Sequence, residues 1–129
     1  MTRAWVVALA LAVVACSRPA ALGVVPYFPG AARVGTTSFI GEAHGFPAAR
    51  WEQVELRTQA PYPQVREFYQ RVRVSGWTST FESEVPKSTG RVFSRYLADG
   101  RRRTFYVITV EERTRSRDVL ILLRRGIAR

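Results

Sequence analysis

The first sixteen residues limit what this chain can fold into, because they hold a long apolar run that ends at the only cysteine. Residues 4–15 (AWVVALALAVVA) are uncharged, Arg3 precedes them, and the small Ala15 stands directly before Cys16. A basic start, an apolar run and a small residue are typical of an export signal. The run has 12 residues, whereas a membrane-spanning helix needs about 20. We therefore predict that residues 1–15 are a signal peptide and that later residues build the fold.

An uncleaved membrane anchor is the alternative for this segment. To be long enough, it would have to continue to Val25, which would place Arg18 and Pro19 inside the span. A charge in the hydrocarbon and a proline within a helix are both costly, so cleavage is favoured.

The residues Val13-Val14-Ala15-Cys16 resemble the lipobox of bacterial lipoproteins. This resemblance implies diacylglycerol on the Cys16 sulfur, cleavage before Cys16, and acylation of the new amino terminus by a fatty acid such as palmitate. It also implies a lipid anchor in the bacterial cell envelope, with the protein facing the periplasm. Ser17 after the cysteine favours the outer over the inner membrane. An ordinary secretory signal, in which Cys16 is incidental, stays open.

A mature chain that starts at Cys16 has 114 residues and no cysteine apart from Cys16 itself. Disulfides, cysteine metal sites and cysteine nucleophiles are then excluded, and stability must come from packing. Residues 16–33 contain several glycines and prolines, and we expect a tether followed by a docking segment there. Its apolar side chains are expected to pack on the domain edge, with a turn at Pro29-Gly30. Residues 34–129 are predicted to form one small domain.

The pattern after the tether predicts several strands and one helix. Val65, Phe68, Tyr69 and Val72 form an apolar stripe at helical spacing, which predicts a helix over about residues 63–75 that stops at Gly76. The glycines and proline of residues 41–47 predict a loop, and Asp99-Gly100 predicts a hairpin. Residues 119–123 are predicted to form a central buried strand. Residues 77–85 are predicted to form a strand with one inward face. The predicted strands cover residues 34–40, 51–58, 77–85, 92–97, 104–110 and 119–123. This order predicts an α+β fold, a single antiparallel sheet of about five to six strands with the helix packed on one face.

A second resemblance supports this fold. The pieces Pro26-Tyr27 and Pro29-Gly30-Ala31, then Val65-Arg-Glu-Phe68-Tyr69 and Gly76-Trp77, resemble a recurrent pattern in small uncharacterised bacterial envelope proteins. In that pattern a Tyr-Pro-Gly-Ala segment precedes a V-x-x-F-Y helix that ends in Gly-Trp. Here Phe28 interrupts the first motif, and Arg73-Val74 replaces the usual leucine-containing turn. The resemblance implies a fold and no activity.

The charge is strongly positive. The chain has 20 basic residues against 10 acidic ones, and all of the basic residues except Lys87 are arginine. Arginine binds phosphate and carboxylate groups bidentately, so two clusters are candidates for an anion-binding rim. They are Arg101, Arg102 and Arg103 at the predicted hairpin and Arg113, Arg115 and Arg117 in the last connection. Solvated loop and edge charges are the alternative.

The sequence offers no catalytic constellation. His44 is the only histidine, so it has no second histidine for a metal site, and we expect neither a metal nor a cofactor. The basic charge could suit nucleic acid, but export argues against it. We therefore expect a non-enzymatic structural or protein-interaction module of the envelope. The alternative is a carrier of an anionic lipid or another small anion, in a cavity between sheet and helix. The expected partners are the membrane and either an envelope protein or an anionic lipid.

Overall fold

The computed structural model describes residues 20–129, so the expected signal peptide and Cys16 lie outside the described residues. The elements in this range are β1 (Ala21–Leu22), β2 (Val25–Pro26), β3 (Ala32–Ala43), β4 (Phe46–Thr58), α1 (Tyr62–Arg71), β5 (Trp77–Lys87), β6 (Gly90–Asp99), β7 (Thr104–Arg113) and β8 (Asp118–Ala128).

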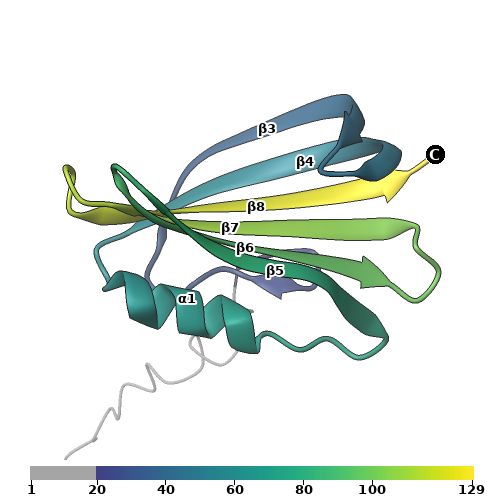
Figure 1. Ribbon diagram of the computed structural model, residues 1–129. Helices are drawn as coiled ribbons and strands as arrows, with labels where there is room; N and C mark the ends of the chain where they lie inside the picture. The colour runs from purple at the N-terminus through teal and green to yellow at the C-terminus, as the bar shows by residue number, and fades with distance from the viewer. Residues whose placement is uncertain (1–19) are drawn as a thin grey trace, which may run out of the picture.

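Six long strands form one antiparallel sheet in the order β3-β4-β8-β7-β6-β5. The sheet is curled, and α1 lies across one of its faces (Figure 1). The predicted antiparallel sheet with a single helix is confirmed for residues 20–129. The strands in this range outnumber the expected five to six, because β1 and β2 form a separate two-stranded pair. As expected, β8 is a central strand, and Ile121 and Leu123 are completely buried in it.

The helix is shorter than the sequence predicted. Pro63 occupies its first turn, as expected, because proline there loses no helical hydrogen bond. The helix ends at Arg71, however, and Val72 already has the extended angles φ −57° and ψ 122°. The prediction of a helix up to residue 75 was wrong because the last carbonyl groups find a partner earlier. Arg95 of β6 donates hydrogen bonds to the carbonyls of Tyr69 and Val72, each at 2.7 Å.

The predicted loop over residues 41–47 is a tight hairpin. β3 continues to Ala43 and β4 begins at Phe46, so His44 and Gly45 alone make the turn. Their φ angles are +55° and +76°, as a two-residue turn with the twist of the strands requires. The prediction was wrong because Phe46 packs over the sheet, with its ring 4.4 Å from that of Phe105, and this contact extends the strand.

The two faces of the sheet carry separate hydrophobic cores. The larger core fills the space between the sheet, α1 and residues 20–31, which we call the N-terminal segment. The smaller core lies on the opposite face and is covered by the tip of the β3–β4 hairpin (Figure 1). We call it the tip core, and its buried members are Ala49, Trp51, Ala98, Phe105 and Val107.

The prediction that β5 turns one face inward holds only in part. Trp77 and Ser83 are half-buried, but Phe81 and Val85 are 46% and 49% exposed. A β-bulge between Ser79 and Phe81 is the reason, because Trp77 packs against the larger core, whereas Phe81 lies beside Tyr96 on the other face of this edge strand.

Candidate functional site: the groove beside the helix

Tyr69 fastens the N-terminal segment to the helix. Its hydroxyl donates to the carbonyl of Pro26 at 3.1 Å and accepts from the backbone N–H of Phe28 at 2.9 Å. Burial raises the pKa of the Tyr69 hydroxyl above its usual range, so the group stays neutral. Val25 and Phe28 are buried, whereas Val24 is 43% exposed. The expected packing of this segment therefore occurs through some of its apolar residues only.

A glycine allows the segment to turn close to the sheet. Gly23 has a φ of +59°, and a Cβ atom built there would lie 2.0 Å from the hydroxyl oxygen of Tyr106. That hydroxyl accepts a hydrogen bond from the backbone N–H of Val24 at 3.2 Å. Any side chain at position 23 would therefore push the segment off the sheet.

An open groove runs between this segment and the outer side of α1. Its volume is about 1430 Å³, which exceeds the 300–1,000 Å³ of an ordinary small-molecule pocket. The apolar part of its wall includes Val24, Pro26, Phe28, Ala60, Phe68 and Val72. Phe28 and Phe68 meet edge to face with their ring centroids 5.3 Å apart, so the wall is held rigidly.

The charged side chains at the groove favour a positive surface. Its basic lining residues are Arg57, Arg71 and Arg73, and its acidic ones are Glu67 and Asp118. Both carboxylates already have a partner within the chain. Glu67 accepts from Arg71 at 2.6 Å, and Asp118 forms a two-point pair with Arg113. The hydrogen bond from Arg113 holds the pKa of Asp118 below its usual range, so this pair persists in mildly acidic solution.

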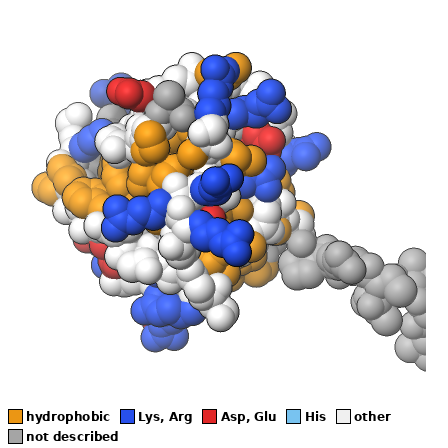
Figure 2. All heavy atoms as spheres, turned by 90° about the vertical axis from the view of Figure 1, so that its right-hand side faces the viewer, with side chains coloured by type: hydrophobic (Ala, Val, Ile, Leu, Met, Phe, Trp, Pro, Cys, Tyr) orange, Lys and Arg blue, Asp and Glu red, His pale blue; other side chains and the backbone are white. Residues whose placement is uncertain are grey.

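The structure does not bring the two predicted arginine clusters together. Arg101, Arg102 and Arg103 lie in the β6–β7 loop, whereas Arg113 is the last residue of β7, and Arg115 and Arg117 lie in the β7–β8 connection. The length of β7 separates the two clusters, so the six arginines do not form a single rim. Figure 2 shows the end of the sheet with the β6–β7 loop, where basic side chains are spread around hydrophobic atoms.

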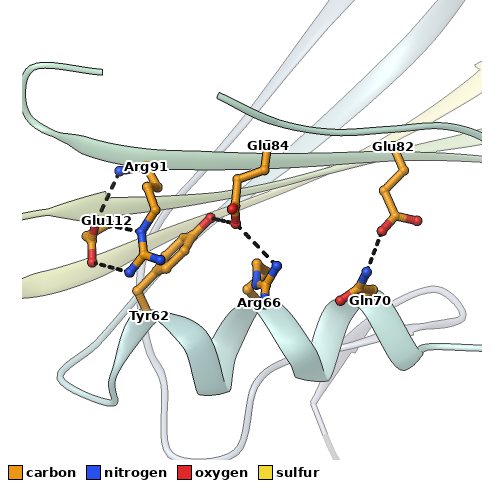
Figure 3. Close-up of polar contacts among 7 residues, drawn as sticks. All are labelled: Tyr62, Arg66, Gln70, Glu82, Glu84, Arg91 and Glu112. Carbon is orange, nitrogen blue, oxygen red and sulfur yellow. Dashed lines mark hydrogen bonds and ion pairs between the residues drawn. The ribbon is translucent and has the colours of Figure 1, made fainter. Parts of the chain in front are cut away.

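The edge of the helix that faces β5 is polar (Figure 3). Tyr62 donates from its hydroxyl to Glu84 at 2.8 Å, and Gln70 donates to Glu82 at 2.8 Å. Arg66 forms a longer ion pair with Glu84, at 3.5 Å. The two glutamates therefore share one face of β5, and both bind side chains of the helix.

Sequence reasoning missed most of the groove. It assigned Phe68 and Tyr69 to the core, yet Phe68 also lines the groove and Tyr69 holds its far wall. The only signal in the sequence was Tyr69 itself, a tyrosine at a position of the apolar stripe where phenylalanine would pack equally well. A buried tyrosine hydroxyl needs a hydrogen-bond partner, and here that partner is the N-terminal segment.

His44 lies at the hairpin tip, where Arg124 donates to its Nε2 atom at 2.7 Å. Burial, and secondly the charge of Arg124, lowers the pKa of His44 below its ordinary value of 6.5. Protonation therefore favours the unfolded chain, so the contribution of His44 to stability is complete above about pH 6.5 and is lost as the pH falls further. We expect urea denaturation to show a larger loss of stability between pH 7.5 and 5.5 in the wild type than in His44→Asn.

Asparagine suits this test because it tolerates the positive φ of the turn. Both proteins share every carboxylate, so the difference between their pH profiles reports His44 alone. Identical pH profiles would contradict the expected role of the imidazole.

Comparison with known proteins returned no matching family model, no matching curated protein and no matching solved structure. Within residues 20–129, no helix is long and apolar enough to cross a membrane. In the same range, no three histidine, cysteine, aspartate or glutamate side chains are grouped so that they could hold a metal ion.

Proposed function

We propose that this protein is a lipid-anchored bacterial envelope protein that acts without catalysis, as a binding module for an apolar segment of another envelope protein. The groove beside α1 is the observation that carries the proposal. It is large, open and lined by apolar side chains that rigid contacts hold in place. A groove of this kind suits an extended or helical segment that inserts several apolar side chains.

The place of the groove in the chain supports a role near the membrane. Only three residues stand between Cys16 and Ala20, the first residue that the structure describes. Four Cα–Cα steps of 3.8 Å reach about 15 Å at most. Lipid on Cys16 would therefore hold the groove close to the membrane surface, where the outer membrane is favoured and the domain faces the periplasm. Ala21 and Val24 of the groove wall follow within a few residues.

An anionic lipid is the second candidate for the occupant. Arg57, Arg71 and Arg73 line the groove and could bind phosphate groups. The space between sheet and helix, where the sequence placed a carrier cavity, is filled by Val65, Ile108 and Ile121, each 0% exposed. A lipid would therefore have to bind in the open groove, beside the apolar wall.

Photo-crosslinking from the groove tests the proposal. A photoreactive residue in place of Gln64, which is exposed and lines the groove, is expected to give one discrete protein adduct in bacterial cells. The matched control is Thr80, which is exposed on β5 and lies outside the groove. The wild type should carry acyl mass on Cys16, and Cys16→Ser should lose both this mass and most of the adduct.

The outcomes separate the candidates. A lipid adduct at position 64 would favour the anionic lipid over the protein segment. Equal adducts at positions 64 and 80, or an adduct at neither, would contradict a binding groove. An unmodified Cys16 in a cleaved, soluble wild type would contradict the lipid anchor.

A further inference from the structure

The free edge of β3 differs from the other edge of the sheet. Every residue of β3 up to Ile40 is exposed, and within residues 20–129 the strand pairs with β4 alone. The stretch from Val34 to Gly41 carries no charge, and Phe39 and Ile40 are 39% and 60% exposed. Long, uncharged edge strands readily pair with another strand, because their outer N–H and C=O groups lack partners.

The opposite edge carries the features that prevent such pairing. β5 contains Glu82, Glu84, Pro86 and Lys87 within its eleven residues. Charges and proline are the usual means by which natural sheets block edge contacts. Side chains of α1 also bind the two glutamates. One edge of this sheet is therefore protected, whereas the other is regular and uncharged from Gly35 to Gly41, between its two β-bulges.

We propose that β3 pairs with β3 of a second copy of this chain, in an antiparallel arrangement that joins the two sheets into one. The charges at the ends of the strand favour a second copy of the chain as the partner. Arg33 stands before the uncharged stretch and Glu42 after it, and both are exposed. Antiparallel pairing therefore brings Arg33 of each copy beside Glu42 of the other, at both ends of the contact.

The register follows from symmetry. Residues that face each other across two antiparallel strands lie on the same face of the sheet, so the two-fold axis must lie between the two copies of one residue. The β-bulge between Arg33 and Gly35 places Arg33 on the same face as Thr36. An axis at Thr37 then sets Arg33 opposite Ile40, and an axis at Ser38 sets it opposite Glu42. Gly41 and Ala43 lie on the face of the tip core, so Glu42 lies on the same face as Arg33, either opposite it or as its diagonal neighbour in the second copy.

The same symmetry has a consequence for the membrane. The two-fold axis stands perpendicular to the sheet, so both copies keep α1 and the N-terminal segment on one common face. Both chains would then leave toward the same side, as two copies anchored in one membrane require. The dimer does not depend on the groove, because Ala32 is the one residue of β3 among the lining residues of the groove, and the pairing stretch from Val34 to Gly41 lies outside it.

Disulfide trapping tests the contact in the full chain, purified in mild detergent. Mild oxidation should crosslink Thr37→Cys or Ser38→Cys into a dimer at least about tenfold faster than Val85→Cys, a control on β5 that is also exposed. The wild type, whose only cysteine is Cys16, controls for crosslinks through that residue. Rates at positions 37 and 38 that are both no faster than the rate at position 85 would overturn the proposal.

Charge reversal tests the orientation. R33E places two acidic groups together at each end of the dimer, and we expect the dissociation constant measured by sedimentation to rise about tenfold. E42R should have the same effect, and the double variant R33E/E42R should return to within about threefold of the wild type. A monomeric wild type at about 100 µM, or a double variant as weak as each single one, would overturn the proposal.

Discussion

Replacing Arg95 with alanine is expected to lower the free energy of unfolding by about 3 kcal/mol. The residue is only 3% exposed, and its guanidinium donates hydrogen bonds to the carbonyls of Tyr69 and Val72. Burial is the largest cause of a lowered pKa for Arg95. The guanidinium nevertheless keeps its charge at neutral pH. Removal of the side chain leaves the carbonyls at the end of the helix without their donor and opens a cavity. Urea denaturation followed by circular dichroism measures the change.

Two further variants separate the causes of this loss. Arg73→Ala removes an exposed arginine that also donates to the carbonyl of Val72, and we expect less than about 1 kcal/mol. Arg95→Met fills most of the space but cannot donate, so it should be nearly as harmful as Arg95→Ala. A methionine variant as stable as the wild type would show that Arg95 acts by packing alone.

The example of Arg95 shows what the sequence could not reveal. Alternation over residues 92–97 predicts a strand, and the strand is there as β6. The pattern gives no hint that Arg95 turns toward a helix 26 residues earlier in the chain. Because that distant contact ends the helix, the helix boundary was missed together with it. Local periodicity identifies elements, whereas their ends depend on partners far apart in sequence.

The groove illustrates the same limit at the level of the site. Its wall comes from the N-terminal segment, the end of β4, α1 and the β7–β8 connection. Each contributing residue, such as Phe68 or Val24, fits an ordinary core or linker position when it is considered alone. An open space between elements depends on how they pack, and composition does not encode it. The arginine clusters were visible in the sequence, but only the sheet topology shows that the length of β7 separates them.

Replacing Trp51 with alanine is expected to cost about 3–5 kcal/mol, the usual range for a large aromatic residue in a core. Trp51 is 0% exposed and is the largest member of the tip core. Its indole N–H also donates to the carbonyl of Gly41 at 3.0 Å, which holds the hairpin tip down. Thermal and urea denaturation should both show the loss, and a change below about 1 kcal/mol would contradict it.

The space beneath the indole provides an internal control. Trp51 lies across the ladder from Gly126 of β8, and a Cβ atom built on Gly126 would approach the ring atoms to 2.8 Å. Gly126→Ala should therefore cost about 1–3 kcal/mol in the wild type, because the close-packed ring cannot give way. In the Trp51→Ala background the same substitution meets an empty space and gains the better strand propensity of alanine. We therefore expect Gly126→Ala to stabilise the Trp51→Ala variant. An equal cost in both backgrounds would show that glycine is needed at position 126 for its backbone conformation and not to make room for the ring.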